Sequence, residues 1–267
     1  VTNAKLENVI PKFAKKIIDQ NGIPTFFDNA VNIHLTKNKE PTSDYCDIFE
    51  KGQLSKENRF VSYSKRLEAL SESLSRNRLY DGLPFLASQG VHSLIRWKEL
   101  PLYKSTFDLT IYSMMLQEVK PDIIIELGSG SGASALWLAD TASALGLNTH
   151  VYSFDINKPL INHNKVTFIE QDLNKIDKLN KSLFWEFFKG KKILIEDAHV
   201  NVNDLLHMFD SILKKDDYLI IEDSSIKQDI ISHFAHEKEP KYKLDQFFLD
   251  FFGTNITSCI NSIFKCN

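Results

Sequence analysis

Paired acids end two apolar runs of this chain, and acids in such pairs can bind a divalent cation. Glu196-Asp197-Ala-His199 follows the first run, and Glu222-Asp223 follows the second. Because the carboxyl ends of neighbouring parallel strands share one edge of a sheet, we expect these side chains to lie close together. Carboxylates this close repel one another unless they are protonated or bound to a cation. We therefore predict that Glu222 and Asp223, together with Glu196 or Asp197 or both, hold a divalent metal. Mg²⁺ is expected first and otherwise Mn²⁺ or Ca²⁺, because these cations prefer oxygen ligands.

A histidine lies beside these predicted metal ligands, where an imidazole can accept a proton near neutral pH. A hydroxyl group bound to a divalent cation has a lowered pKa and becomes a good nucleophile. His199 is therefore the predicted general base. A structural alternative stays open, because acids at these positions also cap helices that we expect to begin at Val200 and Ile226. Capping accounts for one acid in each pair but not for both. The alternative for His199 is that it is a polar residue at the start of a helix without a role in catalysis.

A glycine-rich turn predicts a nucleotide-like ligand at the same edge of the sheet. The apolar run 123–127 leads into Gly128-Ser-Gly-Ser-Gly132, and an amphipathic run begins at Ala133. Glycines let the backbone approach a ligand without interference from Cβ atoms, and free N–H groups at the helix start point toward that ligand. Taken alone, the same pattern also fits a plain strand-to-helix turn.

Acids around this turn favour S-adenosylmethionine (SAM) over a dinucleotide. Asp155 ends the second expected strand, where it can accept both ribose hydroxyls, and Asp172 ends the third, where it can face the adenine amino group. Glu126 would repel a pyrophosphate, whereas SAM carries a sulfonium and an ammonium, and the turn does not read Gly-x-Gly-x-x-Gly. As alternatives, Glu126 is a structural carboxylate and the other two are solvated acids. The expected SAM-binding residues are Glu126, Gly128, Ser129, Gly130, Ser134, Asp155 and Asp172.

The elements that position these residues follow from the hydrophobic pattern. Short apolar runs alternate with helical patterns from about residue 84 onward, which is typical of a parallel sheet covered by helices on both faces. We therefore predict a doubly wound, Rossmann-like α/β fold, closed by an antiparallel pair within 242–265. Expected strands are 123–127, 151–154, 166–169, 193–195 and 218–221, and expected helices are 106–119, 133–145, 176–188 and 200–213. Lys104 and Asp108, at the start of the first of these helices, are further candidates to reach the functional edge.

The first 83 residues do not continue this pattern. Helices are expected there only at 6–18 and 55–75, so residues 1–83 are predicted to form a mainly helical extension, either a lid or an oligomerisation segment. Residues 84–267 form the predicted core domain. The sequence leaves homo-oligomerisation open.

Composition argues against several kinds of partner. A formal net charge of -3 disfavours a surface that binds nucleic acid, because such surfaces carry a clear basic excess. Every apolar run falls short of the roughly 20 residues that span a bilayer, and no secretory signal is present, so we expect no membrane partner. Cys46, Cys259 and Cys266 have no metal-type spacing and cannot all pair, which favours a reducing, cytoplasmic location.

Three segments taken together resemble a known family. They are Lys-Pro-Asp-Ile-Ile-Ile-Glu126-Leu-Gly128, Glu196-Asp197-Ala-His199 and Ile-Ile-Glu222-Asp223-Ser224. They look like the cephalosporin hydroxylase-like family of class I SAM-dependent methyltransferases. That family is similar to the metal-dependent sugar O-methyltransferases of macrolide and rhamnose pathways. The resemblance covers about residues 95–267 and does not reach the first 80 or so.

The resemblance implies a seven-stranded, mostly parallel sheet with an antiparallel C-terminal strand. It implies SAM contacts from the turn 126–132 and from Asp155. Residues 84–267 then correspond to a SAM-dependent methyltransferase core.

The resemblance also implies metal ligands at Glu222 and Asp223 and a catalytic base at His199. The family reads Asp-x-x-His at the end of the fourth strand, which places Glu196 at the position of the third ligand. Glutamate is one methylene longer than aspartate, so Asp197 stays open as the alternative third ligand.

We therefore predict a metal-dependent SAM O-methyltransferase that acts on a hydroxyl of a small molecule, with a sugar or a glycosylated natural product as the expected acceptor. The alternative is a SAM-binding module without catalysis, or a hydroxylase-associated protein of the same fold. An NAD(P) oxidoreductase is disfavoured, because it would need a different glycine pattern and a proton donor such as Tyr-x-x-x-Lys beside the sheet.

Overall fold

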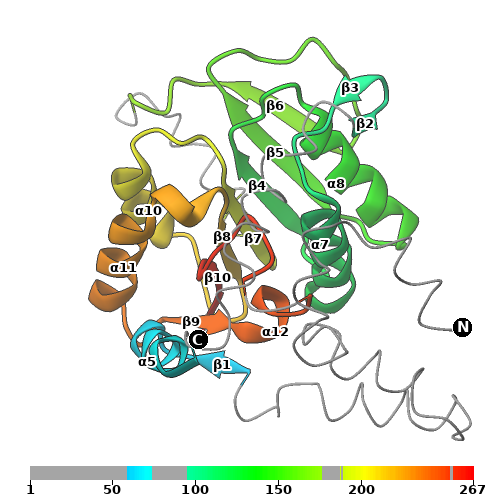
Figure 1. Cartoon of the computed structure of the whole chain (residues 1–267). Helices are drawn as coiled ribbons and strands as arrows, with labels where there is room; N and C mark the ends of the chain where they lie inside the picture. Colours follow the sequence, from blue (N-terminus) through cyan, green and yellow to red (C-terminus); the bar gives the residue numbers. More distant parts are fainter. Residues whose placement is uncertain (1–58, 74–94, 176–186, 188, 253–254) are drawn as a thin grey trace, which may run out of the picture. The chain divides into compact units, whose positions relative to one another are not determined.

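The computed structural model describes residues 59–73, 95–175, 187, 189–252 and 255–267, all within one compact unit, Lys56–Asn267 (Figure 1). The helix predicted at 6–18 and nearly all of the helix predicted at 176–188 lie outside these residues. The predicted domain boundary between residues 83 and 84 also lies outside them.

An eight-stranded sheet forms the centre of this unit, in the order β1-β9-β10-β8-β7-β4-β5-β6. Its strands are β1 (Phe60–Val61), β4 (Ile123–Leu127), β5 (His150–Asp155), β6 (Val166–Glu170), β7 (Lys192–Glu196), β8 (Tyr218–Ile221), β9 (Tyr242–Asp245) and β10 (Ile263–Cys266). Strands β4 to β8 are parallel, and β10 is antiparallel to both β8 and β9. From β4 the chain adds β5 and β6 on one side and then β7 and β8 on the other, so the strand order reverses beside β4. Such a reversal is where open α/β sheets bind their ligands.

These strands confirm the predicted doubly wound fold. The parallel strands β4 to β8 correspond to the predicted apolar runs, and β9 with β10 forms the predicted closing antiparallel pair. The central strands β4 and β7 are buried along their whole length, as expected of parallel strands that are covered on both faces. Strand β1 adds an eighth strand, which pairs antiparallel with β9.

The segment 59–73, which falls in the predicted extension, belongs to the same unit as the core. Arg59 donates hydrogen bonds to both carboxylate oxygens of buried Asp245, each at 2.9 Å, and β1 begins directly after it. Helix α5 (Tyr63–Ser73) follows β1. A strand of two residues is too short to produce a periodic signal in the sequence, so its place in the sheet could not be predicted from hydrophobicity.

Helices cover both faces of the sheet. Figure 1 shows α7 (Thr106–Val119) and α8 (Ala133–Ala144) packed together on one side, and α10 (Val202–Asp210) and α11 (Gln228–Glu237) together on the other. The shorter elements are β2 (Arg96–Trp97), β3 (Leu100–Pro101), the 3₁₀ turn η4 (Ser224–Ile226) and α12 (Gln246–Leu249). No helix in the described part of the chain combines the length and the hydropathy needed to cross a membrane.

Candidate active site

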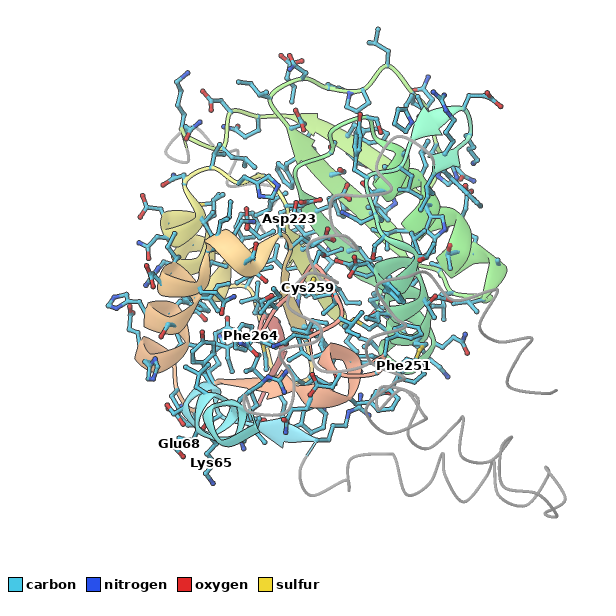
Figure 2. All side chains as sticks on the ribbon, viewed as in Figure 1. Lys65, Glu68, Asp223, Phe251, Cys259 and Phe264 are labelled. Carbon is cyan, nitrogen blue, oxygen red and sulfur yellow. The ribbon has the colours of Figure 1, made fainter. Side chains whose placement is uncertain are left out.

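A cavity of about 550 Å³ opens where strands β4 to β8 end, a volume typical of small-molecule sites. Asp223, which follows β8, marks this end of the sheet, and Figure 2 shows it far from Lys65 and Glu68 of α5. The predicted residues in the cavity lining are Gly128, Ser129, Gly130, Ser134, Asp155, Asp172, Asp197, His199 and Asp223. Three predicted residues, Glu126, Glu196 and Glu222, are buried and do not line it.

The glycine turn lies directly against the end of β7. Gly128 has φ of +107°, and a Cβ atom placed there would lie 2.6 Å from the backbone oxygen of Asp197. Real Cβ atoms do not approach a carbonyl oxygen this closely, and the positive φ independently favours glycine. The glycine at position 128 is therefore what lets the turn and Asp197 line one cavity.

Two of the predicted SAM-binding acids lie on the cavity wall. Asp155 accepts hydrogen bonds from the backbone N–H groups of Gly130 at 2.9 Å and of Asn157 at 3.0 Å, which fixes its carboxylate beside the turn. Asp172 accepts the N–H of Asn174 at 3.0 Å and forms a 2.7 Å ion pair with Lys175, which lowers the pKa of Asp172. Asp155 is therefore held by the glycine turn, whereas Asp172 is held by residues of its own loop.

Glu126 lies behind the turn rather than in the cavity. Its side chain is fully buried, and its Oε2 accepts a 2.5 Å hydrogen bond from Ser153, whose hydroxyl also contacts that of Ser129. Burial raises the pKa of Glu126, and the nearby Lys104 ammonium opposes the rise. Within the described residues, Glu126 Oε1 has no hydrogen-bond partner. Direct contact between Glu126 and SAM therefore stays a prediction.

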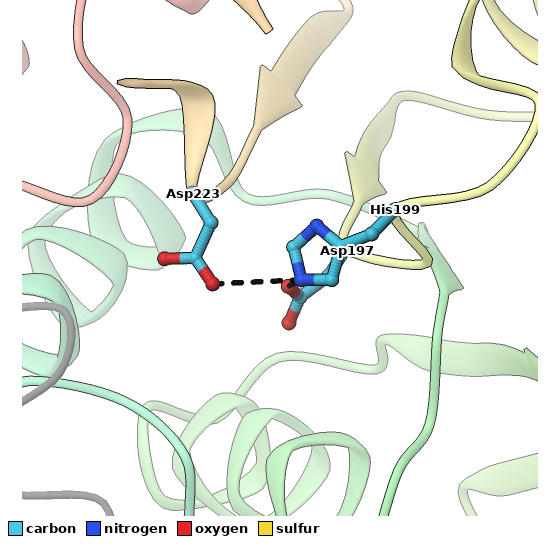
Figure 3. A group of neighbouring side chains, drawn as sticks. All are labelled: Asp197, His199 and Asp223. Atoms are coloured by element: carbon cyan, nitrogen blue, oxygen red, sulfur yellow. Dashed lines mark ion pairs between the residues drawn. The ribbon is translucent and has the colours of Figure 1, made fainter. Parts of the chain in front are cut away.

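Asp197, His199 and Asp223 form a cluster on the cavity wall (Figure 3). His199 Nε2 lies 3.4 Å from Asp197 Oδ1 and 3.5 Å from Asp223 Oδ2. The hydrogen bond with Asp223 raises the pKa of His199. Burial pushes the pKa of Asp223 upward, but the interactions with His199 and the positive charges of Lys104 and Lys227 together lower that pKa. The cluster thus joins the ends of β7 and β8, as the two acid pairs predicted.

Two residues of this cluster have unusual backbone geometry. His199 has φ of +57° and Asp223 has φ of +44°, both in the left-handed region that non-glycine residues seldom occupy. Each such residue costs on the order of 1–3 kcal/mol and persists only where the surrounding structure holds it. Seven other non-glycine residues in the described part of the chain also have a positive φ, so this geometry does not by itself mark the cluster as a functional site.

Glu196 binds the loop that follows β7 and does not line the cavity. Its Oε1 accepts the backbone N–H groups of Ala198 and His199, each at 3.1 Å, and its Oε2 forms a 2.7 Å ion pair with Lys227. Both oxygens of this fully buried carboxylate are therefore occupied. Of the two alternatives for the third ligand, Asp197 lines the cavity and Glu196 does not, and the metal ligand set itself stays a prediction. The helix that we expected to begin at Val200 begins at Val202, with Asn201 as its N-cap, so Glu196 does not cap it.

Glu222 is likewise occupied inside the fold. The Tyr112 hydroxyl donates a short hydrogen bond to Oε1, and Lys104 Nζ lies 2.6 Å from Oε2. The same ammonium lies 2.6 Å from Asp197 Oδ2, so Lys104 bridges the ends of β7 and β8. Glu222 was predicted beside Asp223 in the ligand set, but in this arrangement only Asp223 of that pair reaches the cavity.

Of the two further candidates at the start of α7, only Lys104 lines the cavity. Asp108 is buried, and its Oδ1 accepts hydrogen bonds from the Thr257 hydroxyl at 2.6 Å and the Ser258 N–H at 3.1 Å. Asp108 therefore anchors the C-terminal segment. The sequence feature that points to Lys104 is its position at the start of α7. It directly precedes Ser105, whose hydroxyl caps that helix by accepting the Asp108 N–H.

The residues present suit the two predicted ligands. Two carboxylates and one imidazole offer donor atoms that all lie within 4.8 Å of one another, a set able to hold a divalent cation. The glycine turn and Asp155 line the other part of the same cavity. A nucleoside-like ligand and a cation-bound oxygen would therefore meet in one space.

The chain matches known methyltransferases over part of its length. Residues 89–184 match the model of the family described as Rhamnosyl O-methyltransferase/CmcI. The rhamnosyl O-methyltransferase of Mycobacterium leprae (strain TN) is 28% identical over 143 residues, which are 49% of this chain and 60% of that protein. The corresponding protein of Mycobacterium bovis is 26% identical over 138 residues, 46% of this chain and 54% of that protein. The chain thus spans at most about 60% of the length of these curated relatives.

Solved structures agree in fold. CmcI with Mg and SAM superposes with a TM-score of 0.55 at 21% identity, over 66% of this chain and 77% of that one. CmcI with SAH gives a TM-score of 0.53 at 22% identity, over 65% and 83% respectively. The described unit has the Rossmann-like fold of class I methyltransferases, and residues 89–184 are similar to the Rhamnosyl O-methyltransferase/CmcI family.

Proposed function

We propose that this protein transfers the methyl group of SAM to a hydroxyl of a small molecule, with a sugar or a glycosylated natural product as the acceptor class. The observation that carries this proposal is the single cavity lined both by the turn with Asp155 and by the cluster of Asp197, His199 and Asp223. The rhamnosyl O-methyltransferase relatives support the reaction type and the sugar as acceptor.

The turn side of the cavity is proposed to bind SAM. Gly130 and Ser129 bring backbone close to the ligand, and Asp155, held by the Gly130 N–H, is placed to accept the ribose hydroxyls. Ser134 and Asp172 complete this wall. The sulfonium then points toward the cluster, since both walls enclose the same space.

The cluster side is proposed to bind the acceptor. Asp197 and Asp223 would hold a divalent cation, most simply Mg²⁺, which would supply positive charge next to the acceptor oxygen. His199 takes the hydroxyl proton as the oxygen attacks the methyl carbon and the bond from that carbon to sulfur breaks. The products are a methyl ether, S-adenosylhomocysteine and the protonated imidazole. Alignment of two substrates is worth roughly 7–11 kcal/mol of the barrier, so positioning carries much of the rate.

Calorimetry with SAM and with NAD tests the cofactor, because the proposal requires SAM to bind and NAD not to bind. Transfer of labelled methyl groups from SAM to a panel of glycosides, phenols and peptides then tests the acceptor class. Absence of SAM binding contradicts the proposal. SAM binding without transfer to any hydroxyl acceptor, with divalent cation present, would support the alternative of a non-catalytic SAM-binding module.

A further inference from the structure

Lys104 places a permanent positive charge inside the acidic site. Its Nζ lies 2.6 Å from Asp197 Oδ2 and 2.6 Å from Glu222 Oε2, and its side chain is 4% exposed. An ammonium with two carboxylate partners at this distance is a strong charge-assisted interaction. The space between the ends of β7 and β8 is therefore already occupied by a cation of the chain itself.

The backbone around Lys104 keeps that charge in place. Its N–H donates to the Leu102 carbonyl at 2.9 Å, and the Leu102 side chain is 1% exposed. Ser105, the next residue, caps α7 through the Asp108 N–H. The segment before α7 is thus anchored on both sides of Lys104. If the ammonium moved away, the carboxylates of Asp197 and Glu222 would lose their positively charged partner.

The ammonium changes which oxygens are left for a cation in the cavity. Glu222 has both oxygens occupied, by Lys104 and by Tyr112. Of the two Asp197 oxygens, Oδ2 pairs with Lys104, and Oδ1 lies near His199. Asp223 forms no ion pair with Lys104 among the described interactions. A divalent cation placed between Asp197 and Glu222 would lie within a few ångströms of the ammonium, and like charges at that distance repel strongly.

We propose that Lys104 is a positioning residue that excludes Glu222 from cation binding and restricts a divalent cation to the side of Asp197 Oδ1 and Asp223. This inference rests on the proposed function in one respect, namely that the cluster takes a divalent cation. Its consequence is that the protein binds the cation more weakly than its acidic residues would allow, because one carboxylate ligand is withheld and a positive charge stays nearby.

The test is a titration of the full chain with Mn²⁺, followed by electron paramagnetic resonance near neutral pH, without SAM or acceptor. Lys104→Met removes the charge but keeps an unbranched side chain. We expect it to bind Mn²⁺ roughly tenfold or more tightly than the unchanged protein, because affinity rises with the number of charged ligands. Lys104→Arg retains the charge, so its Mn²⁺ affinity should stay within about threefold of the unchanged protein.

Lys192→Met is a matched control for the removal of a buried lysine. Lys192 is fully buried and pairs with Asp217 at 2.6 Å, but it lies at the opposite end of the same strand, β7. Its loss should leave Mn²⁺ affinity unchanged. A folded Lys104→Met protein whose Mn²⁺ affinity equals or falls below that of the unchanged protein overturns the proposal.

Glu222→Gln gives a second test if Lys104→Met does not fold. Because Lys104 withholds Glu222 from the cation, this variant should keep Mn²⁺ affinity within about threefold, and a loss of tenfold or more would overturn the proposal. Failure of Mn²⁺ to bind any of these proteins also overturns it. None of these Mn²⁺ titrations measures methyl transfer. Calorimetry with SAM tests the proposed enzymatic function independently, so the two proposals can fail separately.

Discussion

Gly128 touches the backbone of Asp197 so closely that no side chain fits between them, since a Cβ atom would lie 2.6 Å from the Asp197 carbonyl oxygen. Gly128 directly follows β4 and Asp197 directly follows β7, and the order of the strands reverses between these two strands. One contact therefore joins the wall proposed to bind SAM to the wall proposed to bind the acceptor.

Gly128→Ala should disrupt that junction. The added methyl group meets backbone rather than a flexible side chain, and alanine at a φ of +107° is strained as well. We expect SAM affinity, measured by calorimetry, to fall roughly tenfold or more, with the free energy of unfolding lowered by about 1–3 kcal/mol. Gly146→Ala is the control, because Gly146 also has a positive φ of +74° but no atom within 4 Å of its added Cβ. Equal SAM affinity in both variants would contradict the assigned role of Gly128.

Asp155→Ala should weaken SAM binding more than Asp172→Ala does. Asp155 is fixed by the N–H of Gly130 in the turn itself, whereas the Asp172 carboxylate is engaged by Asn174 and Lys175 of its own loop. A lost pair of hydrogen bonds to ribose corresponds to roughly a tenfold to hundredfold loss of affinity. Calorimetric titration of each variant with SAM gives the comparison. A larger loss of affinity in Asp172→Ala than in Asp155→Ala would indicate that Asp172, and not Asp155, binds the ribose.

The sheet and the glycine turn could be predicted because their signals are local. Continuous apolar runs indicate the buried parallel strands. Glycines at alternate positions indicate a turn whose backbone comes close to another segment, and Gly128 does come close to the backbone of Asp197. The direction of each acid could not be predicted in the same way. Glu196 is held by Lys227, 31 residues away, and Asp197 by Lys104, 93 residues away, so distant partners decide which of two adjacent acids faces the cavity.

Removal of divalent cations should abolish methyl transfer, and Asp223→Ala should have the same effect. Asp223 contributes a carboxylate to the cavity cluster without an ion pair to a described lysine, so it is the acid best placed to hold the proposed cation. The measurement is turnover with excess chelator, followed by addition of Mg²⁺ or Mn²⁺. Activity should return in the unchanged protein but not in Asp223→Ala. Full turnover in excess chelator would remove the cation from the reaction.

His199→Gln separates the role of a base from that of a metal ligand. As a general base, His199 contributes roughly 10²–10⁴-fold to kcat, while its loss leaves Mn²⁺ affinity within about threefold. Its Nε2 lies 3.4 Å from Asp197 Oδ1 and 3.5 Å from Asp223 Oδ2, close enough that ligation is the competing role. Rapid-quench kinetics gives kcat and Mn²⁺ titration gives the affinity. A tenfold or larger loss of affinity would assign His199 to the cation instead.

Arg66→Met should destabilise the fold, because Arg66 ties α5 to the C-terminal segment. Its guanidinium is 2% exposed and bonds both oxygens of Asp250 at 2.8 Å, as well as Gln246, Asn255 and Asn261. Loss of a buried charged donor that leaves several acceptors unpaired costs about 3 kcal/mol. Urea unfolding measures this cost, with Lys65→Met as the control, since Lys65 is the exposed preceding residue of the same helix (Figure 2). If both variants unfold at the same urea concentration, α5 contributes little to the core, and the segment 59–73 is an appendage as the sequence pattern predicts.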